Sequence, residues 1–150
     1  RWSRCDLKTT SLLANELLRQ LSVDAGCAET ILVRDGQLME GASSSVFLVR
    51  DGVILAPPKT RLILPGITYD VVLELAEREG LPHQVRPLAE TELRAADEIW
   101  LTSSTKEILA VATLDGQPVG NGRRPGALYR RMLSLYQGYK HAVMRGKAAQ

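Results

Sequence analysis

The sequence has few residues suited to metal binding or disulfide formation. It contains two cysteines and two histidines. Cys5 and Cys27 have neither a CxxC spacing nor the spacing of a metal site, and His83 and His141 have no partners at metal or triad spacing. We therefore expect no metal, two free thiols in a cytoplasmic protein, and histidines that lie at the surface.

Long apolar runs and a strong charge of one sign are also missing. No run approaches the roughly 20 apolar residues that span a bilayer, and the net charge is only +2. Neither a membrane nor a nucleic acid is therefore expected as a partner. The glycine patterns of dinucleotide sites (GxGxxG) and of P-loops (GxxxxGK followed by Ser or Thr) do not occur, so nothing favours those two classes of site.

The remaining composition is that of one globular domain. Of the 150 residues, 45% are hydrophobic and 24% are charged, which is typical of a soluble folded chain with a single core. The chain starts at Arg1 without a methionine and enters patterned sequence at once. This beginning predicts that a further domain precedes the chain.

Apolar periodicity and turn residues predict a mixed α/β, α+β-like domain. Residues 1–8 look extended, which places Lys8 between a strand end and a helix start. Asp-Gly pairs at 35–36 and 51–52 separate apolar runs and are typical of β-hairpins. With this much antiparallel pairing, a doubly wound parallel sheet is not expected. Helices are predicted over 11–25, 68–79, 90–96 and 125–143, and strands over 29–34, 37–39, 45–50, 53–56, 83–87, 97–102 and 108–114.

The first and last predicted helices have clear apolar faces. The face of the first helix carries Leu12, Leu13, Leu17, Leu18, Leu21 and Ala25. The last helix is predicted to bury Leu128, Met132, Leu135, Tyr136 and Tyr139.

The chain is organised around residues 62–70 (LILPGITYD). Pro65-Gly66 stops an apolar run, and a helical pattern follows at once. The first amides of that helix, at Ile67 and Thr68, lie at the positive end of its dipole and could seat a phosphate. The alternative is an ordinary strand-to-helix turn capped by Thr68. A second polar turn, residues 103–107 (SSTKE), could likewise hold an anion or cap a break in the backbone.

Lys8 and Glu40 are the candidates for chemistry. A lysine held between apolar neighbours loses hydration and becomes a nucleophile toward a carbonyl, whereas most lysines are solvated surface charges. Glu40 is followed by a glycine and three serines nearby, which suits a carboxylate held beneath a ring nitrogen; an edge strand with a polar turn is the alternative. A lysine, a carboxylate and two phosphate-seating turns are the groups needed to hold pyridoxal 5′-phosphate (PLP). Spacing alone does not establish that cofactor.

Four motifs, in order, resemble the C-terminal, larger domain of fold-type IV PLP-dependent aminotransferases, and most closely the D-amino acid aminotransferases. The similarity covers nearly the whole chain. Each motif alone is weak, and the set is highly specific. The motifs are RCDLK at 4–8 with SLLAN at 11–15, EGASSSVF at 40–47, ILPGIT at 63–68, and LTSSTKE at 101–107.

The resemblance implies a role for each matching residue. Lys8 would be the Schiff-base lysine and the proton shuttle, Glu40 would pair with the pyridinium nitrogen, and Leu64 would pack on the ring. Glu29 would lie near the lysine without touching the cofactor; the alternative is a glutamate at the surface. The other cofactor-binding residues would be Gly66, Ile67, Thr68, Ser103 and Ser104 around the phosphate, and Ser43 and Ser44 beside the ring.

The chain departs from the family pattern at two positions and in its length. Tyr69 stands where the family often has Arg, and Ser45 where it often has Asn; we expect both to be peripheral to the chemistry. Residues 1–144 would be the C-terminal cofactor-binding domain and residues 145–150 a tail, with the N-terminal domain absent. Because that domain completes the site, we expect the chain alone to be weakly active or inactive.

The resemblance implies a transaminase that moves an amino group between an amino acid, such as D-alanine, and a 2-oxo acid, acting as a homodimer. Three alternatives stay open. These are a lyase of the aminodeoxychorismate type, a branched-chain L-amino acid aminotransferase, and a non-catalytic cofactor-binding relic. The KTTSLLAN run after the lysine favours the aminotransferase over the lyase.

Overall fold

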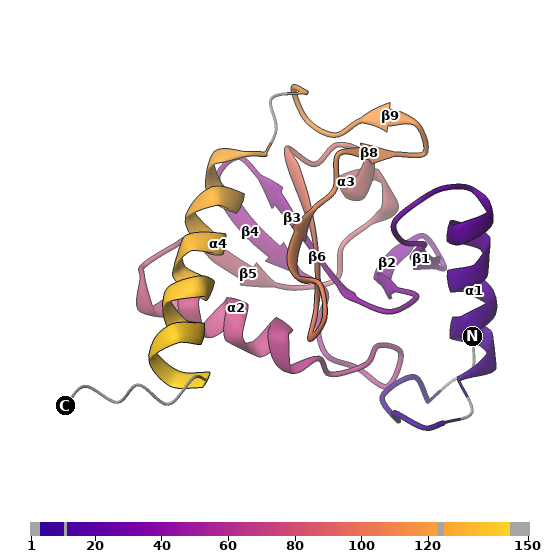
Figure 1. The fold of residues 1–150 in the computed structure, drawn as a ribbon. Coiled ribbons are helices and arrows are strands. Elements are labelled where there is room, and N and C mark those ends of the chain that lie inside the picture. The colour runs from indigo at the N-terminus through magenta and orange to yellow at the C-terminus, as the bar shows by residue number, and fades with distance from the viewer. Residues whose placement is uncertain (1–3, 11, 123–124, 145–150) are drawn as a thin grey trace.

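A computed structural model describes residues 4–10, 12–122 and 125–144 (Figure 1). The helices are α1 (Leu13–Asp24), α2 (Ile67–Arg78), α3 (Glu90–Arg94) and α4 (Ala127–Tyr139), the last continued by a π-helical turn, Lys140–Met144. The strands are β1 (Ile31–Arg34), β2 (Gln37–Gly41), β3 (Ser45–Arg50), β4 (Val53–Ala56), β5 (His83–Val85), β6 (Glu98–Ser103), β7 (Glu107–Ala110), β8 (Thr113–Leu114) and β9 (Gln117–Pro118).

The central sheet has five strands in the order β5-β4-β3-β6-β7. Its pairs are antiparallel except β4–β5, which is parallel. Two hairpins, β1–β2 and β8–β9, form separate two-stranded sheets. The mixed α/β domain with antiparallel hairpins is therefore confirmed.

The central sheet is buried on both faces. One face packs against α2 and α4 through an aromatic group of Phe47, Tyr69, Trp100 and Tyr129. The other face is covered by β2, α3 and the residues around them, including Leu38, Leu88 and Leu93. Because both faces are covered, β3 reads as a continuous apolar run, SVFLVR, in which only Arg50 is exposed.

The register of β3 and β6 brings two polar turns together. These strands are antiparallel, and Ser45 at the start of β3 pairs with Thr102 near the end of β6. The turn before β3 (residues 42–44) and the turn after β6 (residues 104–106) therefore lie at the same end of these two strands. The candidate site lies at this end of the sheet.

Several elements differ from their predictions. The predicted strand 108–114 is interrupted: β7 ends at Ala110 and β8 begins at Thr113. Helix α2 begins at Ile67 with Gly66 at the N-cap position, so Thr68 does not cap it. No strand occurs in the described part of residues 1–8, where Cys5 and Asp6 form a turn. The predicted tail, residues 145–150, lies outside the described residues.

The two predicted apolar helix faces have different outcomes. In α1 the leucines Leu13, Leu17 and Leu21 are 70%, 59% and 61% exposed, and the buried residue is Ser22. In α4 the prediction holds for Met132 and Tyr136, which are buried. Leu128, Leu135 and Tyr139 pack at the edge of the same core, and Tyr129, which was not predicted, is buried with them.

Candidate active site

One cavity of about 240 Å³ is lined by ten of the residues that the sequence singles out. They come from the loop before α1, from β2 and the turn after it, from the start of α2, and from the end of β6. These segments are far apart in the sequence, and the fold brings them together. These residues are Lys8, Glu40, Ser43, Ser44, Leu64, Gly66, Ile67, Thr68, Ser103 and Ser104.

Glu40 lies on β2 with its side chain buried; the residue is 4% exposed. Its Oε2 accepts a hydrogen bond of 3.0 Å from the backbone amide of Leu64. A carboxylate removed from water is costly unless it is paired, and this amide offsets part of that cost. The same bond fixes the loop that carries Leu64 against the strand that carries Glu40.

Lys8 belongs to an irregular loop that is held in place by its neighbours. The backbone amide of Cys5 donates to the carbonyl of Arg61 at 2.7 Å, and the side chain of Asn15 on α1 donates to the carbonyl of Ala42 at 2.8 Å. These bonds tie the segments on either side of Lys8 to the loop before α2 and to the turn after β2. The Lys8 side chain itself is exposed, so the loss of hydration expected from its apolar neighbours is not found.

The N-terminus of α2 forms one end of the cavity. Gly66, Ile67 and Thr68 line it, and the Thr68 side chain is buried. The amides of the first turn have no carbonyl partner within their own helix and lie at the positive end of its dipole. Ser103 and Ser104, at the end of β6 and in the turn that follows, line the same cavity. Hydroxyls and helix amides together suit a phosphate group.

Glu29 lies outside this cavity but contacts its serines. Its carboxylate accepts hydrogen bonds from the hydroxyls of Ser43 and Ser44 at 2.7 and 2.8 Å, and it pairs with Lys106 Nζ at 2.8 Å. Burial alone would raise the pKa of Glu29, but the Lys106 ammonium and the two hydroxyls outweigh it and hold the pKa below its usual value of 4.5. The side chain is 2% exposed, so the alternative of a surface glutamate is wrong.

Gly41 permits this close packing at the end of β2. A Cβ at this position would overlap the Ser44 hydroxyl and approach Glu29 Cγ to 3.1 Å. A larger residue would therefore push the serine turn away from Glu29. The glycine after Glu40 is required by space rather than by an unusual backbone conformation.

Four further residues belong to the site or its surroundings, and the sequence did not assign them a role. Thr102 and Asn15 line the cavity, and Lys106 contacts Glu29. Ser45, expected to be peripheral, also lines the cavity. All four residues fall within the quoted motifs, so position in a motif was the available signal. The Thr102 hydroxyl is buried and has no hydrogen-bond partner among the described residues.

The residues present fit PLP. An amine, a buried carboxylate, and a cluster of hydroxyls and helix amides match the aldehyde, the ring nitrogen and the phosphate of that group. The buried Thr102 hydroxyl supplies a further hydrogen-bonding atom that the described residues do not satisfy. A buried polar atom left in this way is a recognised sign of a ligand or water site.

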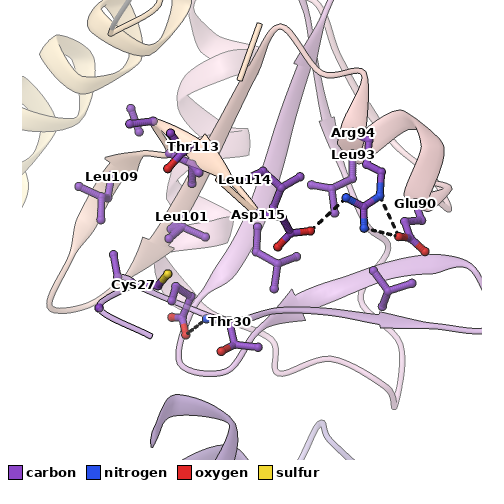
Figure 2. A pocket seen from close by; sticks show the side chains of 18 residues that line it. Cys27, Thr30, Glu90, Leu93, Arg94, Leu101, Leu109, Thr113, Leu114 and Asp115 are labelled. Carbon is purple, nitrogen blue, oxygen red and sulfur yellow. Dashed lines mark hydrogen bonds and ion pairs between the residues drawn. The ribbon is translucent and has the colours of Figure 1, made fainter. Parts of the chain in front are cut away.

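A second cavity, of about 460 Å³, is lined in part by Glu29 and is mostly apolar (Figure 2). Leu93, Leu101, Leu109 and Leu114 are among its walls. Arg94 reaches toward both Glu90 and Asp115, with hydrogen bonds of 2.7 and 3.0 Å. Because both carboxylates occupy this guanidinium, none of the described residues that line the cavity offers an unpaired Lys or Arg to an acidic ligand.

Comparison with known proteins places the chain in a family. The model of the family described as "Amino-transferase class IV" matches residues 1–114. The chain belongs to the class IV aminotransferases. Among class IV relatives, the D-alanine aminotransferase of Bacillus licheniformis is 42% identical over 137 residues, which cover 91% of this chain and 48% of that protein. The D-alanine aminotransferase of Staphylococcus epidermidis is 35% identical over 139 residues, 93% of this chain and 49% of that protein.

Solved class IV structures have the same fold. The branched-chain amino acid aminotransferase of Escherichia coli is similar with a TM-score of 0.81 and 32% identity, over 91% of this chain and 49% of that chain. The branched-chain enzyme of Thermobaculum terrenum, in its PLP form, gives a TM-score of 0.82 and 30% identity, over 89% of this chain and 44% of that chain. The chain spans about half the length of the class IV relatives it matches.

The described part of this class IV chain has neither a metal-binding cluster nor a membrane-spanning helix. Within residues 4–10, 12–122 and 125–144, no three His, Cys, Asp or Glu side chains are grouped as metal ligands would be. The described helices include none that is long and apolar enough to cross a membrane.

Proposed function

We propose that the gene product containing this chain is a PLP-dependent aminotransferase that moves an amino group between a D-amino acid, such as D-alanine, and a 2-oxo acid. One observation carries the proposal: Lys8, Glu40 and the two hydroxyl-bearing phosphate turns line a single cavity. Class IV membership supports the reaction type. Residues 1–144 would be the cofactor-binding domain of a longer cytoplasmic enzyme.

The residues around the cavity would divide the work. When bound, PLP supplies a ring that draws electrons from the substrate Cα. Glu40, as a carboxylate, keeps a proton on the ring nitrogen by pairing with its positive charge. Lys8 Nζ would hold the cofactor aldehyde in the absence of substrate and would serve as the base that moves a proton during the reaction. Leu64 orients the ring, while Thr68, Ser103 and Ser104 hold the phosphate.

The choice of substrate rests on the relatives. The D-alanine aminotransferase of Bacillus licheniformis is 42% identical, whereas the branched-chain enzymes of Escherichia coli and Thermobaculum terrenum are 32% and 30% identical. This difference favours a D-amino acid. The high structural similarity of the branched-chain enzymes makes a branched-chain L-amino acid aminotransferase the second candidate.

We include a homodimer in the proposal. The exposed leucines of α1, at 59% to 70% exposure, are spaced four residues apart and form one apolar stripe. An apolar stripe of this kind supports contact with another protein surface. Since the chain spans half the length of its relatives, we expect residues 1–150 by themselves to be weakly active or inactive.

A spectroscopic experiment tests the proposal. The purified gene product, given PLP, should show the visible absorption band of lysine-bound cofactor, and Lys8→Ala should abolish that band. The matched control is Lys140→Ala, because Lys140 pairs with Glu107 away from the cavity. Bleaching by D-alanine supports the first candidate, and bleaching by L-leucine alone supports the second. A wild-type protein without the band would overturn both and favour a non-catalytic relic.

A further inference from the structure

We propose that Lys106 is a positioning residue that, through Glu29, clamps together the two neighbouring serine-bearing turns that line the candidate cofactor site. The inference rests on the proposed function, because it assigns these serines to PLP. It concerns a residue to which neither the motifs nor the family match gives a role.

Lys106 contacts both turns at once. Its backbone amide donates to Ser103 Oγ at 3.0 Å, within the turn that follows β6. Its Nζ reaches the other turn, at 2.8 Å from Glu29 Oε2 and 3.3 Å from Ser43 Oγ, and it lies 3.4 Å from the carbonyl of Ala28. One residue therefore links Ser103, at the end of β6, with Ser43, in the turn after β2.

Glu29 completes the clamp by binding the turn that carries Ser43 and Ser44. Its Oε2 accepts from the Ser43 amide at 3.3 Å in addition to the two serine hydroxyls, and its Oε1 accepts from the Thr30 amide at 3.1 Å. A side chain that is 2% exposed keeps its negative charge only if donors and a cation surround it. The donors come from residues 30, 43 and 44, and Lys106 is the cation.

This arrangement fixes the orientation of the serine hydroxyls. The Ser43 hydroxyl proton is donated to Glu29, so the Ser43 oxygen faces Lys106 as an acceptor. The Ser103 oxygen accepts the Lys106 amide, so its own proton is directed toward Thr105 Oγ1, 3.3 Å away, or toward an anion in the cavity. Hydroxyls that are oriented before binding cost less entropy when a ligand arrives.

Other charged groups near Glu29 do not replace Lys106. The second cavity, which Glu29 borders, is also lined by Cys27 and by Arg94, whose guanidinium bonds to Glu90 and Asp115. On the candidate-site side, the lining includes the cation Lys8 and the acids Glu16 and Glu40. Among the described residues, Lys106 alone forms an ion pair with Glu29. Removing its charge would leave the Glu29 carboxylate bonded only to amides and hydroxyls, and the pKa of Glu29 would rise.

The test compares Lys106→Met, Glu29→Gln and the double variant of the gene product. The PLP dissociation constant is measured by absorbance titration between about pH 5 and about pH 8. At neutral pH each single variant should bind PLP about tenfold more weakly than wild type. The double variant should bind at most about twentyfold more weakly than wild type, because both changes break the same clamp. In Lys106→Met alone, affinity should fall further as the pH is lowered, since Glu29 then takes up a proton and releases the serines.

Lys140→Met is the matched control. The side chain of Lys140 is 25% exposed and that of Lys106 is 26% exposed. Lys140 pairs with Glu107, the first residue of β7, and does not line the cavity. It should leave the affinity and its pH dependence unchanged. Lys106→Arg, which retains the charge, should bind PLP within about threefold of wild type and covers the case in which Lys106→Met folds poorly.

The outcomes separate this inference from the proposed function. A wild-type protein with no visible band would overturn the proposed function, and the clamp with it. A normal band together with equal affinity in wild type and Lys106→Met at every pH would overturn the clamp alone. Equal loss in Lys106→Met and Lys140→Met would also overturn it, because any tether of the turn would then suffice. As a readout independent of turnover, the unfolding midpoint of the cofactor-free Lys106→Met protein should lie below that of wild type at neutral pH, and this deficit should shrink as the pH is lowered, because a raised Glu29 pKa lets the folded protein take up the proton at higher pH than wild type does.

Discussion

Glu40 on β2 and Leu64 in the loop before α2 are joined by a hydrogen bond of 3.0 Å between a carboxylate oxygen and a backbone amide. The two residues are proposed to contact different parts of the same ring, its nitrogen and its face. A single bond thus sets the position of the acid relative to the residue that would orient the ring. The bond needs an acceptor oxygen at position 40, but it does not need a negative charge.

Glu40→Gln separates these two needs. The amide oxygen keeps an acceptor for the Leu64 amide, so we expect the unfolding midpoint to change little. The charge that would hold a proton on the ring nitrogen is lost, so kcat should fall by about 100-fold or more. Steady-state kinetics and thermal unfolding check the two parts, with the exposed Glu74→Gln as the control. Full activity in Glu40→Gln would contradict the assigned role.

Thr102→Val should weaken cofactor binding without lowering the stability of the fold. The hydroxyl is buried without a partner among the described residues, so its replacement by a methyl group should leave the free energy of unfolding unchanged or raise it by about 1 kcal/mol. If that hydroxyl bonds the cofactor, PLP affinity should drop about three- to tenfold. Urea unfolding of the cofactor-free protein and an absorbance titration measure both, with the exposed Thr91→Val as control. Lower stability with unchanged affinity would show that the hydroxyl serves the fold alone.

The local parts of the fold could be predicted from the sequence. The β3–β4 hairpin lies at the predicted bounds, 45–50 and 53–56, because an Asp-Gly pair between apolar runs is a local signal. The candidate site residues could be predicted because the four motifs occur together and in order. The contacts between those motifs could not be predicted. Lys106 meets Glu29 across 77 residues of sequence. The β3–β6 register brings the turn that carries Lys106 next to the serine turn that Glu29 contacts.

The burial of individual side chains was the other property that could not be predicted from the sequence. The leucines of α1 follow the helical period, as do the buried residues of α2, and the period alone does not tell whether a face meets this chain's core or another surface. In α1 the stripe faces outward. Likewise, Lys8 has the apolar neighbours that would remove its hydration, yet they belong to an irregular loop and leave it exposed.

Changing the leucine stripe should therefore alter association and leave the fold intact. Leu17→Gln with Leu21→Gln should change the free energy of unfolding of the chain by less than about 0.5 kcal/mol for each site. Leu38→Ala, at a side chain that is 1% exposed, should cost about 2–5 kcal/mol. In the gene product, the double glutamine variant should shift the mass measured by light scattering from dimer toward monomer. A large loss of stability in the chain itself would mean that the stripe is packed in solution.

Tyr69 should give the protein a pH-dependent stability in alkali. Burial, followed by the nearby Asp70 charge, raises the pKa of its phenol from 10.0 to about 12. The unfolded chain loses this proton at lower pH than the folded protein, so the stabilising contribution is complete below pH 10 and is lost as the pH rises toward about 12. Tyr69→Phe removes this loss, together with the 2.8 Å hydrogen bond to the Pro57 carbonyl. Urea unfolding of both proteins from neutral to alkaline pH tests this, and parallel curves would contradict it.

Glu98 should hold α4 against the central sheet. Its carboxylate accepts from the amides of Leu128 and Tyr129 at 3.1 and 2.8 Å, in the first turn of α4, and from Trp100 Nε1 at 2.9 Å. Loss of these bonds in Glu98→Ala should lower the free energy of unfolding by about 2–3 kcal/mol. Glu98→Gln keeps one acceptor oxygen and should lose less, and the exposed Glu77→Ala serves as the control in urea unfolding.

Gly126 gives a second measure of the same contact. A Cβ on Gly126 would overlap the Glu98 carboxyl group, so Gly126→Ala should destabilise the wild-type protein. In a Glu98→Ala background the overlap is gone, and the same substitution should cost clearly less. A double-mutant cycle measures this difference as a coupling free energy. Equal costs in the two backgrounds would mean that Gly126 is required for its backbone and that Glu98 does not position the start of α4.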